Sequence, residues 1–439
     1  MLNLSFSVHR VNASFGMKRK ELEELQQKVI FKVMFPKMVE NKEFLDWLVA
    51  QKFDLAFSHI YDVCHIGLIH YAKIPSWIWL NSGGLMDFVA YHLGVPTVPS
   101  YVPPLIMEST DEMDFVQRMK SFIGHSITMI SDPETEIFRE LVDPNFPDIV
   151  DIAKMCPLVM VNSNELYELT RPSLAKVINI GGVGIQMKDA KPLSKEFQEV
   201  VDNCEGLVVF SFGSVTPSHR MPAEWKKAFL EAFSRFPKLN FVLRYEGTDL
   251  NDQLPKNVYL FKWLPQADLL RHPKTVAFIS HGGYNSLQEV ITAGVPLITV
   301  ALFGDQPRNA KLAERHRFAI NIRKGDLSAD TVAEALQRLM TDKSYSKNVK
   351  RLSEMVKRKP VSPDHLLVAW AEFVAEFKTL ENLVPAGTKL NFIQYHSLDV
   401  IVFLLTILTV VLFVLWKLLK FILLKLYALL FRATKEKQM

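Results

Sequence analysis

A run of polar residues, HGGYNSLQE, lies between two apolar segments of the sequence. His281 ends a predicted strand, Gly282 follows it in a turn, and Asn285 and Ser286 open a predicted helix. The N-terminus of a helix attracts phosphate through its unpaired N–H groups and the helix dipole. Glu289 comes four residues after Asn285, on the same helix face and one turn further along. The run therefore predicts a phosphate site with a carboxylate beside it.

Polar residues also follow three other predicted strands, at the strand end or on the loop after it. Ser214 follows one strand, Trp263 and Gln266 follow another, and Asp305 and Gln306 lie on the loop after a third. In parallel α/β sheets, ligands bind at the carboxyl ends of the strands. The combined set offers an aromatic surface for stacking, an amide for a base edge, a phosphate site and acids for hydroxyl groups. This chemistry suits a nucleoside diphosphate joined to a sugar.

Other classes of protein fit the sequence less well. No Walker lysine follows the glycines, which argues against a nucleoside triphosphatase. The sequence also lacks a GxGxxG motif, which argues against a dinucleotide-binding fold of the dehydrogenase type. The net charge of +4 comes with no concentrated basic face before the C-terminal end, so no nucleic-acid partner is predicted. Three widely spaced cysteines form neither a disulfide framework nor a CxxC metal pattern, and no metal site is predicted. Each polar residue alone could be structural; Trp263, for example, could belong to the core.

The elements that must position these residues alternate between strand and helix. Segments such as FDLAFSHI, SWIWL and PLVMVNS read as buried strands, with the helical segment GLIHYAK between the first two. From residue 207 the alternation is regular, which predicts parallel sheets with right-handed crossovers. The turn-rich stretch 186–197 is the predicted linker between two α/β domains.

The C-terminal segment predicts a membrane anchor. Residues 400–416 contain no charged residue, and with Leu398 and Lys417 they approach the roughly 20 residues that span a bilayer. Lysines and arginines follow this segment, which places the tail in the cytosol and the bulk of the chain on the other side of the membrane. The N-terminus has no apolar run of the kind found in a signal peptide. We therefore expect that this sequence begins inside a longer protein.

The sequence closely resembles the UDP-glycosyltransferases, specifically the animal UDP-glucuronosyltransferase type. The resemblance rests on FSFGS, on LFKWLPQADLLRHPKTVAFISHGGYNSLQEVITAGVPLI and on LFGDQ, and it extends to SYVP and to FIQYHSLDV before the predicted span. It covers nearly the whole chain but lacks the family's N-terminal portion. The fold it implies has two Rossmann-like domains of the glycosyltransferase B type, the first incomplete, with one C-terminal transmembrane helix.

The resemblance also implies domain limits and partners. Residues 1–188 would form a partial acceptor-binding domain, 189–385 the UDP-sugar-binding domain, 398–420 the transmembrane helix and 421–439 a basic cytosolic tail. The partners would be a UDP-sugar, a small lipophilic acceptor, the lipid bilayer, and other copies of the chain or other family members. No cofactor beyond the UDP-sugar co-substrate is expected. Lysines third and fifth from the C-terminus resemble a retrieval signal for the endoplasmic reticulum.

The resemblance assigns a role to each donor-site residue. Trp263 would stack on the uracil, Gln266 would contact the uridine and Glu289 would hold the ribose hydroxyls. The remaining residues would bind the diphosphate and the sugar. Those for the diphosphate are Ser214, His281, Gly282, Asn285 and Ser286, and those for the sugar hydroxyls are Asp305 and Gln306. The family is inverting: a general base takes a proton from an acceptor hydroxyl, which attacks the anomeric carbon as UDP leaves.

The catalytic base is the main departure from the family. Its catalytic histidine lies in the portion that this chain lacks, so the catalytic residue is unassigned. His59, with Asp62 three residues later, is the one candidate for a substitute base, although a histidine on an apolar strand is more often structural. The expected function is transfer of glucuronic acid or glucose to a lipophilic hydroxyl. The alternative is a catalytically impaired, UDP-sugar-binding membrane protein that regulates full-length partners.

Overall fold

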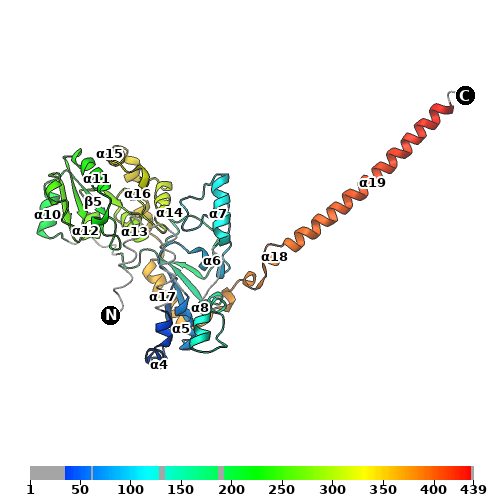
Figure 1. Ribbon diagram of the computed structural model, residues 1–439, viewed down its shortest axis with the longest axis horizontal. Coiled ribbons are helices and arrows are strands. Elements are labelled where there is room, and N and C mark those ends of the chain that lie inside the picture. Colours follow the sequence, from blue (N-terminus) through cyan, green and yellow to red (C-terminus); the bar gives the residue numbers. More distant parts are fainter. Residues whose placement is uncertain (1–34, 61–62, 128–133, 186–191, 437–439) are drawn as a thin grey trace. The chain divides into compact units, whose positions relative to one another are not determined.

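The structure is a computed structural model that describes residues 35–60, 63–127, 134–185 and 192–436, with side chains described to residue 427. The chain divides into two compact units, residues 1–384 and 385–439. Helices and strands alternate through the first unit, as the sequence predicts, and Figure 1 shows their course. The charged and apolar pattern of residues 17–50 predicts helix, and the part of it at residues 17–34 lies outside the described residues.

The first sheet has four parallel strands in the order β1-β2-β3-β4. These are β1 (Ala56–His59), β2 (Trp77–Asn81), β3 (Leu158–Val161) and β4 (Val177–Asn179). Its helices are α3 (Phe35–Glu40), α4 (Lys42–Ala50), α5 (Cys64–Tyr71), α6 (Asp87–His92), α7 (Phe115–Ile127), α8 (Glu134–Leu141) and α9 (Ile149–Lys154). Trp77 and Trp79 are buried in the core of this half. They therefore stabilise the sheet from within the core.

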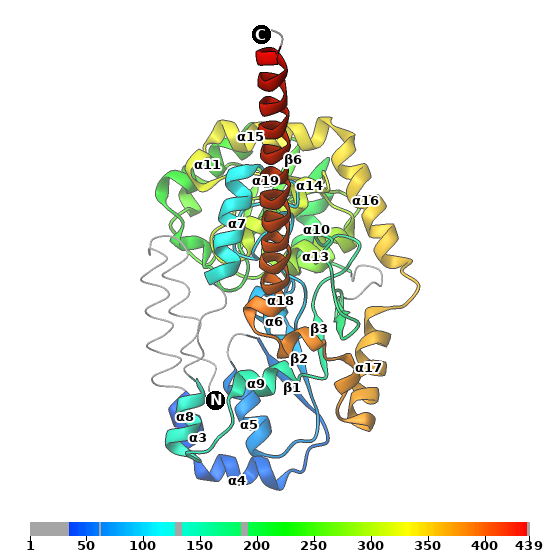
Figure 2. The ribbon, with the colours of Figure 1, turned by 90° about the vertical axis from the view of Figure 1, so that its right-hand side faces the viewer.

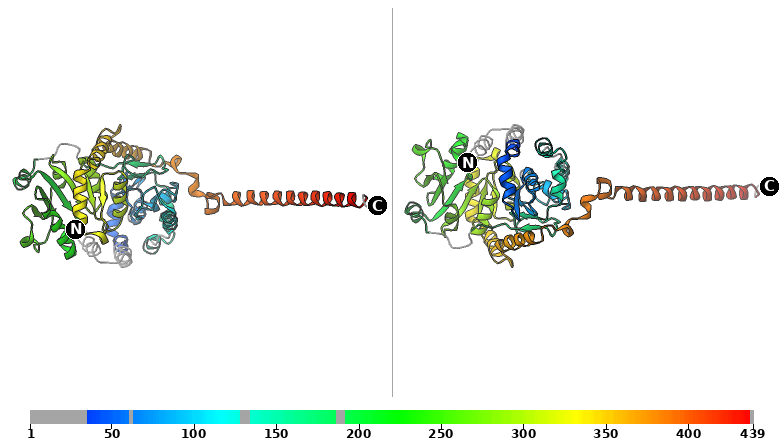
Figure 3. Two further views of the ribbon diagram at one scale, coloured as in Figure 1. Left: turned by 90° about the horizontal axis from the view of Figure 1, so that it is seen from above. Right: turned by 90° about the horizontal axis from the view of Figure 1, so that it is seen from below.

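The second sheet has six parallel strands in the order β10-β9-β8-β5-β6-β7. The strands are β5 (Gly206–Ser211), β6 (Leu239–Arg244), β7 (Val258–Phe261), β8 (Thr275–Ser280), β9 (Leu297–Thr299) and β10 (Ala319–Asn321). Every residue of β5 is buried, because a parallel sheet is covered by helices on both faces. Figure 3 shows these strands enclosed between helices.

The helices of the second sheet follow its strands in turn. They are α10 (Lys195–Asp202), α11 (Ala223–Ser234), α12 (Gln266–Arg271), α13 (Tyr284–Ala293), α14 (Gln306–Arg315), α15 (Ala329–Thr341) and α16 (Lys343–Lys357). Gly294 ends α13 with a φ of 72°, a left-handed conformation that glycine adopts without strain. This glycine fixes the length of the helix that follows His281.

Helix α17 (Pro363–Phe377) returns to the first sheet. Val374 and Leu380 pack with Ile78 and Met160 in one buried cluster, and Ser76 Oγ donates a hydrogen bond of 2.8 Å to the Lys378 carbonyl. Amphipathic spacing alone does not say which sheet a helix covers, so sequence reading could not place this return. The domain limits stated above stay a prediction.

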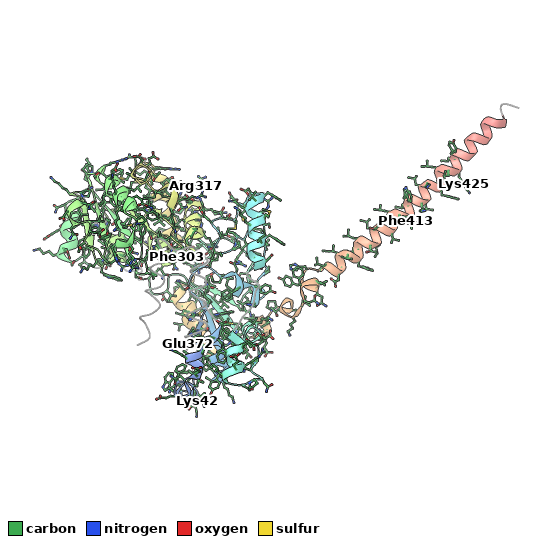
Figure 4. The ribbon with its side chains drawn as sticks, in the orientation of Figure 1. Lys42, Phe303, Arg317, Glu372, Phe413 and Lys425 are labelled. Carbon is green, nitrogen blue, oxygen red and sulfur yellow. The ribbon has the colours of Figure 1, made fainter. Side chains whose placement is uncertain are left out.

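The second unit contains α18 (Phe392–Tyr395) and the single long helix α19 (Leu398–Glu436). Residues Leu398–Tyr427 of α19 are long and apolar enough to cross a membrane. Side chains project from α19 along this stretch, among them the labelled Phe413 and Lys425 (Figure 4). The predicted span and the first part of the predicted tail therefore lie on one continuous helix.

Candidate functional site

The second sheet has a topological switch point between β5 and β8. The chain winds in one direction from β5 to β7 and in the other from β8 to β10, so the strand order reverses between these two neighbours. Ligands of doubly wound sheets bind in the crevice at the carboxyl ends of such strands. Ser214 follows β5 on a turn and is exposed, and His281 follows β8 directly. The predicted phosphate residues therefore stand at the place where this fold binds ligands.

The His281 ring lies against two glycines. A Cβ atom on Gly213 would come within 2.8 Å of the ring, and one on Gly283 within 2.6 Å. Gly213 also has a φ of 77°, so a larger residue would be strained as well as crowded. Burial lowers the pKa of His281 from 6.5 to about 4, and the ring is therefore neutral near pH 7. Its Nδ1 lies 3.3 Å from Ser280 Oγ.

Helix α13 begins without a side-chain cap. Its N-cap residue is Gly283, and no side chain accepts a hydrogen bond from the first turn. The first N–H groups of a helix have no partner within the helix, so they are available to a phosphate. Asn285 and Ser286 lie in this turn. Asn285 Oδ1 accepts a hydrogen bond of 3.1 Å from Asn162 Nδ2, on the loop after β3 of the first sheet. The first turn of α13 is thus held beside the first sheet.

Gln266 and Glu289 meet through a hydrogen bond from Gln266 Nε2 to Glu289 Oε2. Gln266 is the first residue of α12, and Glu289 lies one turn into α13. Burial raises the pKa of Glu289, and the hydrogen bond from Gln266 opposes this rise. The structure therefore places an amide and a carboxylate side by side, as a site for a base edge and ribose hydroxyls requires.

Trp263 is exposed over 68% of its surface, so it is not a core residue. The Arg244 guanidinium lies 5.1 Å from the centre of the Trp263 ring and donates a hydrogen bond to the Gly213 carbonyl. Arg244 thus connects the aromatic surface to the turn beside His281. Sequence reading missed this residue, although its position at the last residue of a strand, β6, was a usable signal.

Asp305 and Gln306 differ in what they contact. Asp305 Oδ2 accepts a hydrogen bond of 2.8 Å from Asn309, whose Nδ2 also donates to the Gly282 carbonyl at 3.0 Å. Gln306 is buried, and its Oε1 accepts hydrogen bonds from the backbone N–H groups of Leu302 and Phe303 at 2.8 and 3.1 Å. Gln306 therefore shapes the loop that carries Asp305. Burial raises the pKa of Asp305.

These contacts form one continuous chain along the carboxyl edge of the second sheet. It runs from Trp263 through Arg244 and Gly213 to His281, and from Gly282 through Asn309 to Asp305, with Gln266 and Glu289 on the neighbouring helices. His59 stands elsewhere, at the carboxyl end of β1, with its ring centre 4.3 Å from that of His65. Asp62 lies outside the described residues. The catalytic role of His59 stays a prediction.

Comparison with known proteins decides the family. The family model described as UDP-glucoronosyl and UDP-glucosyl transferase matches residues 5–433. The chain belongs to this family. It is 35% identical over 387 residues to UDP-glucuronosyltransferase 1A7 of Rattus norvegicus, covering 87% of this chain and 71% of that relative. It is 34% identical over 388 residues to UDP-glucuronosyltransferase 1A5 of Homo sapiens, with the same coverage.

Solved structures agree on the fold of this UDP-glycosyltransferase. Os79 from O. sativa in complex with UDP has a TM-score of 0.56 at 16% identity, covering 81% of this chain and 86% of that chain. The glycotransferase of kitacinnamycin has a TM-score of 0.53 at 18% identity, covering 79% and 81%. The predicted glycosyltransferase B fold with two α/β domains and one apolar C-terminal helix is confirmed. The chain is an enzyme of this family, and the comparisons do not support the alternative of an impaired regulatory protein.

Proposed function

We propose that this UDP-glycosyltransferase transfers glucuronic acid or glucose from a UDP-sugar to a hydroxyl group of a small lipophilic acceptor, with inversion at the anomeric carbon. The observation that carries the proposal is the continuous edge from Trp263 to Asp305, which lies at the switch point of the second sheet. It presents a stacking surface, a paired amide and carboxylate, an uncapped helix N-terminus and an acid, in the order that uridine, ribose, diphosphate and sugar would need.

Each part of the donor has a matching group. The exposed ring of Trp263 stacks on uracil, and Gln266 and Glu289 hold the uridine edge and the ribose hydroxyls. The N–H groups at the start of α13 bind the diphosphate, together with the hydroxyls of Ser214 and Ser286 and the neutral His281. Asp305 accepts hydrogen bonds from the sugar hydroxyls. A neutral His281 can donate one hydrogen bond to a phosphate oxygen without requiring acid conditions.

In the proposed reaction one bond forms, one bond breaks and one proton is transferred. The acceptor oxygen bonds to the anomeric carbon from the face opposite UDP, and the bond between that carbon and the phosphate oxygen breaks. The acceptor proton goes to a general base, and UDP takes the bonding electron pair. The N-terminus of α13 stabilises the negative charge that develops on the diphosphate. The proposed reaction needs no metal and no cofactor besides the UDP-sugar. His59 is the candidate base within the described residues.

The proposed setting is a membrane, where lipophilic acceptors concentrate. The long apolar helix α19 supports a single-pass anchor. By the positive-inside argument, the basic tail is cytosolic and the bulk of the chain lumenal, in the endoplasmic reticulum. Protease treatment of sealed microsomes should remove only an epitope placed after Met439. Loss of an epitope at the N-terminus in the same sealed vesicles would contradict this orientation.

Membranes from cells that express the chain test the reaction. We expect a simple phenol to be glycosylated with UDP-glucuronic acid or UDP-glucose, and the coupling constant of the anomeric proton to report inversion. The Glu289→Ala variant should lose this activity, whereas Glu334→Ala, exposed on α15, should keep it. A product of retained configuration, or no product with either donor while UDP still binds, would contradict the proposal. Activity that survives His59→Ala would remove His59 as the base.

A further inference from the structure

Helix α7 packs on the first half of the molecule through its polar face. Ser121 and His125 are buried, and both contact the Val102 carbonyl: Ser121 Oγ donates to it at 3.3 Å, and His125 Nε2 lies 2.7 Å from it. Gly124 lies on the same face, where a Cβ atom would come within 2.8 Å of Pro104. The helix thus approaches the loop before it closely, and its small and polar residues fill the contact.

The opposite face of α7 is apolar and exposed. We call this face the α7 stripe. Its five residues and their exposed fractions are Phe115 (72%), Val116 (49%), Met119 (48%), Phe122 (63%) and Ile123 (50%). The spacing of three to four residues places them on one side of the helix. Figures 1 and 2 both show α7 at the outer surface of the unit formed by the two sheets. The usual orientation of an amphipathic surface helix is therefore reversed.

Cations flank the α7 stripe on both sides. At 100° per residue, Arg118 and Lys120 lie on opposite edges of the stripe. Both are exposed. Arg118 Nη1 donates a hydrogen bond of 2.8 Å to the Met113 carbonyl just before the helix, and neither cation forms an ion pair with a carboxylate among the described residues. Their aliphatic stems can extend along an apolar layer while their charges reach anionic headgroups. An apolar face bordered by cations is typical of a helix that lies in a membrane interface.

We propose that the α7 stripe docks on the lipid bilayer as a second membrane contact, separate from α19. This inference rests on the proposed membrane setting: α19 is long and apolar enough to cross a bilayer, and such an anchor would keep the protein next to lipid. A second copy fits less well, because a symmetric contact would bring the flanking cations of two identical stripes together. In lipid, the apolar side chains lie among acyl chains and Arg118 and Lys120 lie among the headgroups.

The test uses the full chain reconstituted into vesicles of phosphatidylcholine and phosphatidylserine. An environment-sensitive fluorophore is attached at Met119→Cys or, as a control, at Glu334→Cys on α15, both in a Cys204→Ser background. We expect the probe at 119 to emit at shorter wavelength and to lose intensity when the acyl chains carry bromine. The probe at 334 should do neither. Equal responses at the two positions would overturn the proposal.

Two further results distinguish a lipid bilayer from a second copy of the chain as the partner of the α7 stripe. A shift to shorter wavelength at 119 that persists in dilute detergent and is insensitive to brominated lipid would mean contact with a second copy, and would overturn lipid docking. The double variant Phe115→Ser, Phe122→Ser should abolish bromine quenching at 119 while UDP binding is unchanged. The matched variant Phe373→Ser, Phe377→Ser removes two exposed phenylalanines from α17 and should leave the quenching intact.

Discussion

Arg308 Nη2 lies 2.5 Å from Glu168 Oε1, in an ion pair that joins α14 of the second sheet to the loop after β3 of the first. Both side chains are largely buried. Glu168 Oε2 also accepts a hydrogen bond of 2.9 Å from the Tyr284 hydroxyl at the start of α13. Tyr284 is followed directly by Asn285, and Arg308 lies one turn after Asp305. The pair therefore holds two parts of the proposed donor site against the first sheet.

Removing one partner of this pair should destabilise the protein strongly. Glu168→Gln leaves the Arg308 charge buried without its carboxylate, and such a loss costs about 3–5 kcal/mol. The free energy of unfolding, followed by denaturant titration in detergent, measures this. The double variant Glu168→Gln, Arg308→Met should lose less than the sum of the single variants, because it leaves no unpaired charge. Additive losses would show that the two side chains are not coupled.

The sequence predicted the second half of the molecule better than the contacts between the halves. The buried runs and the glycines identified β5, β8 and α13, because the residues of each segment themselves indicate its burial pattern and its backbone conformation. The Glu168–Arg308 pair joins residues 140 positions apart, and neither carries a local signal. Gln306 shows the same limit: no local pattern indicates that its Oε1 accepts backbone hydrogen bonds within its own loop, and its role toward the sugar stays a prediction.

The exposed ion pairs between the two sheets should show charge complementarity. Asp111 on the first-sheet side pairs with Arg315 on the second, and Glu108 pairs with Arg323 in the same sense. Asp111→Lys places two cations together, so it should lower the free energy of unfolding. Adding Arg315→Glu should restore most of that loss, with a coupling energy of about 0.5–3 kcal/mol. The rescue should weaken in 1 M salt, where the screening length is about 3 Å. No rescue at low salt would contradict the direct pairing.

Trp263→Ala should weaken the binding of UDP by about 5- to 150-fold, since stacking on an aromatic side chain contributes about 1–3 kcal/mol per base. Isothermal titration of UDP into the detergent-solubilised chain measures the change. Trp47→Ala removes another exposed tryptophan, on α4, far along the sequence from the site. It should leave the affinity unchanged. A loss of affinity in both variants would point to a general effect on folding.

Glu289→Ala should remove the preference of the protein for a ribose. If the carboxylate holds ribose hydroxyls, the wild-type chain binds UDP more tightly than 2′-deoxy-UDP, and the variant binds both alike. The comparison of two ligands within one variant separates ribose recognition from any loss of structure. Glu334→Ala on α15 should keep the wild-type ratio. A ratio that is unchanged by Glu289→Ala would place the ribose hydroxyls elsewhere.

The neutral state of His281 should make the folded chain sensitive to acid. Burial lowers the pKa of His281 to about 4, whereas the unfolded chain titrates near 6.5. Below pH 6.5 the unfolded state therefore binds a proton that the folded state does not, and stability falls as the pH drops from 6.5 towards 4. The melting temperature, measured across this range, should fall more steeply for the wild-type chain than for His281→Gln. UDP affinity should be independent of His281 titration between pH 6.5 and 8, because the ring is already neutral there. Parallel melting curves for the two proteins would show that the ring takes up its proton while the protein is still folded.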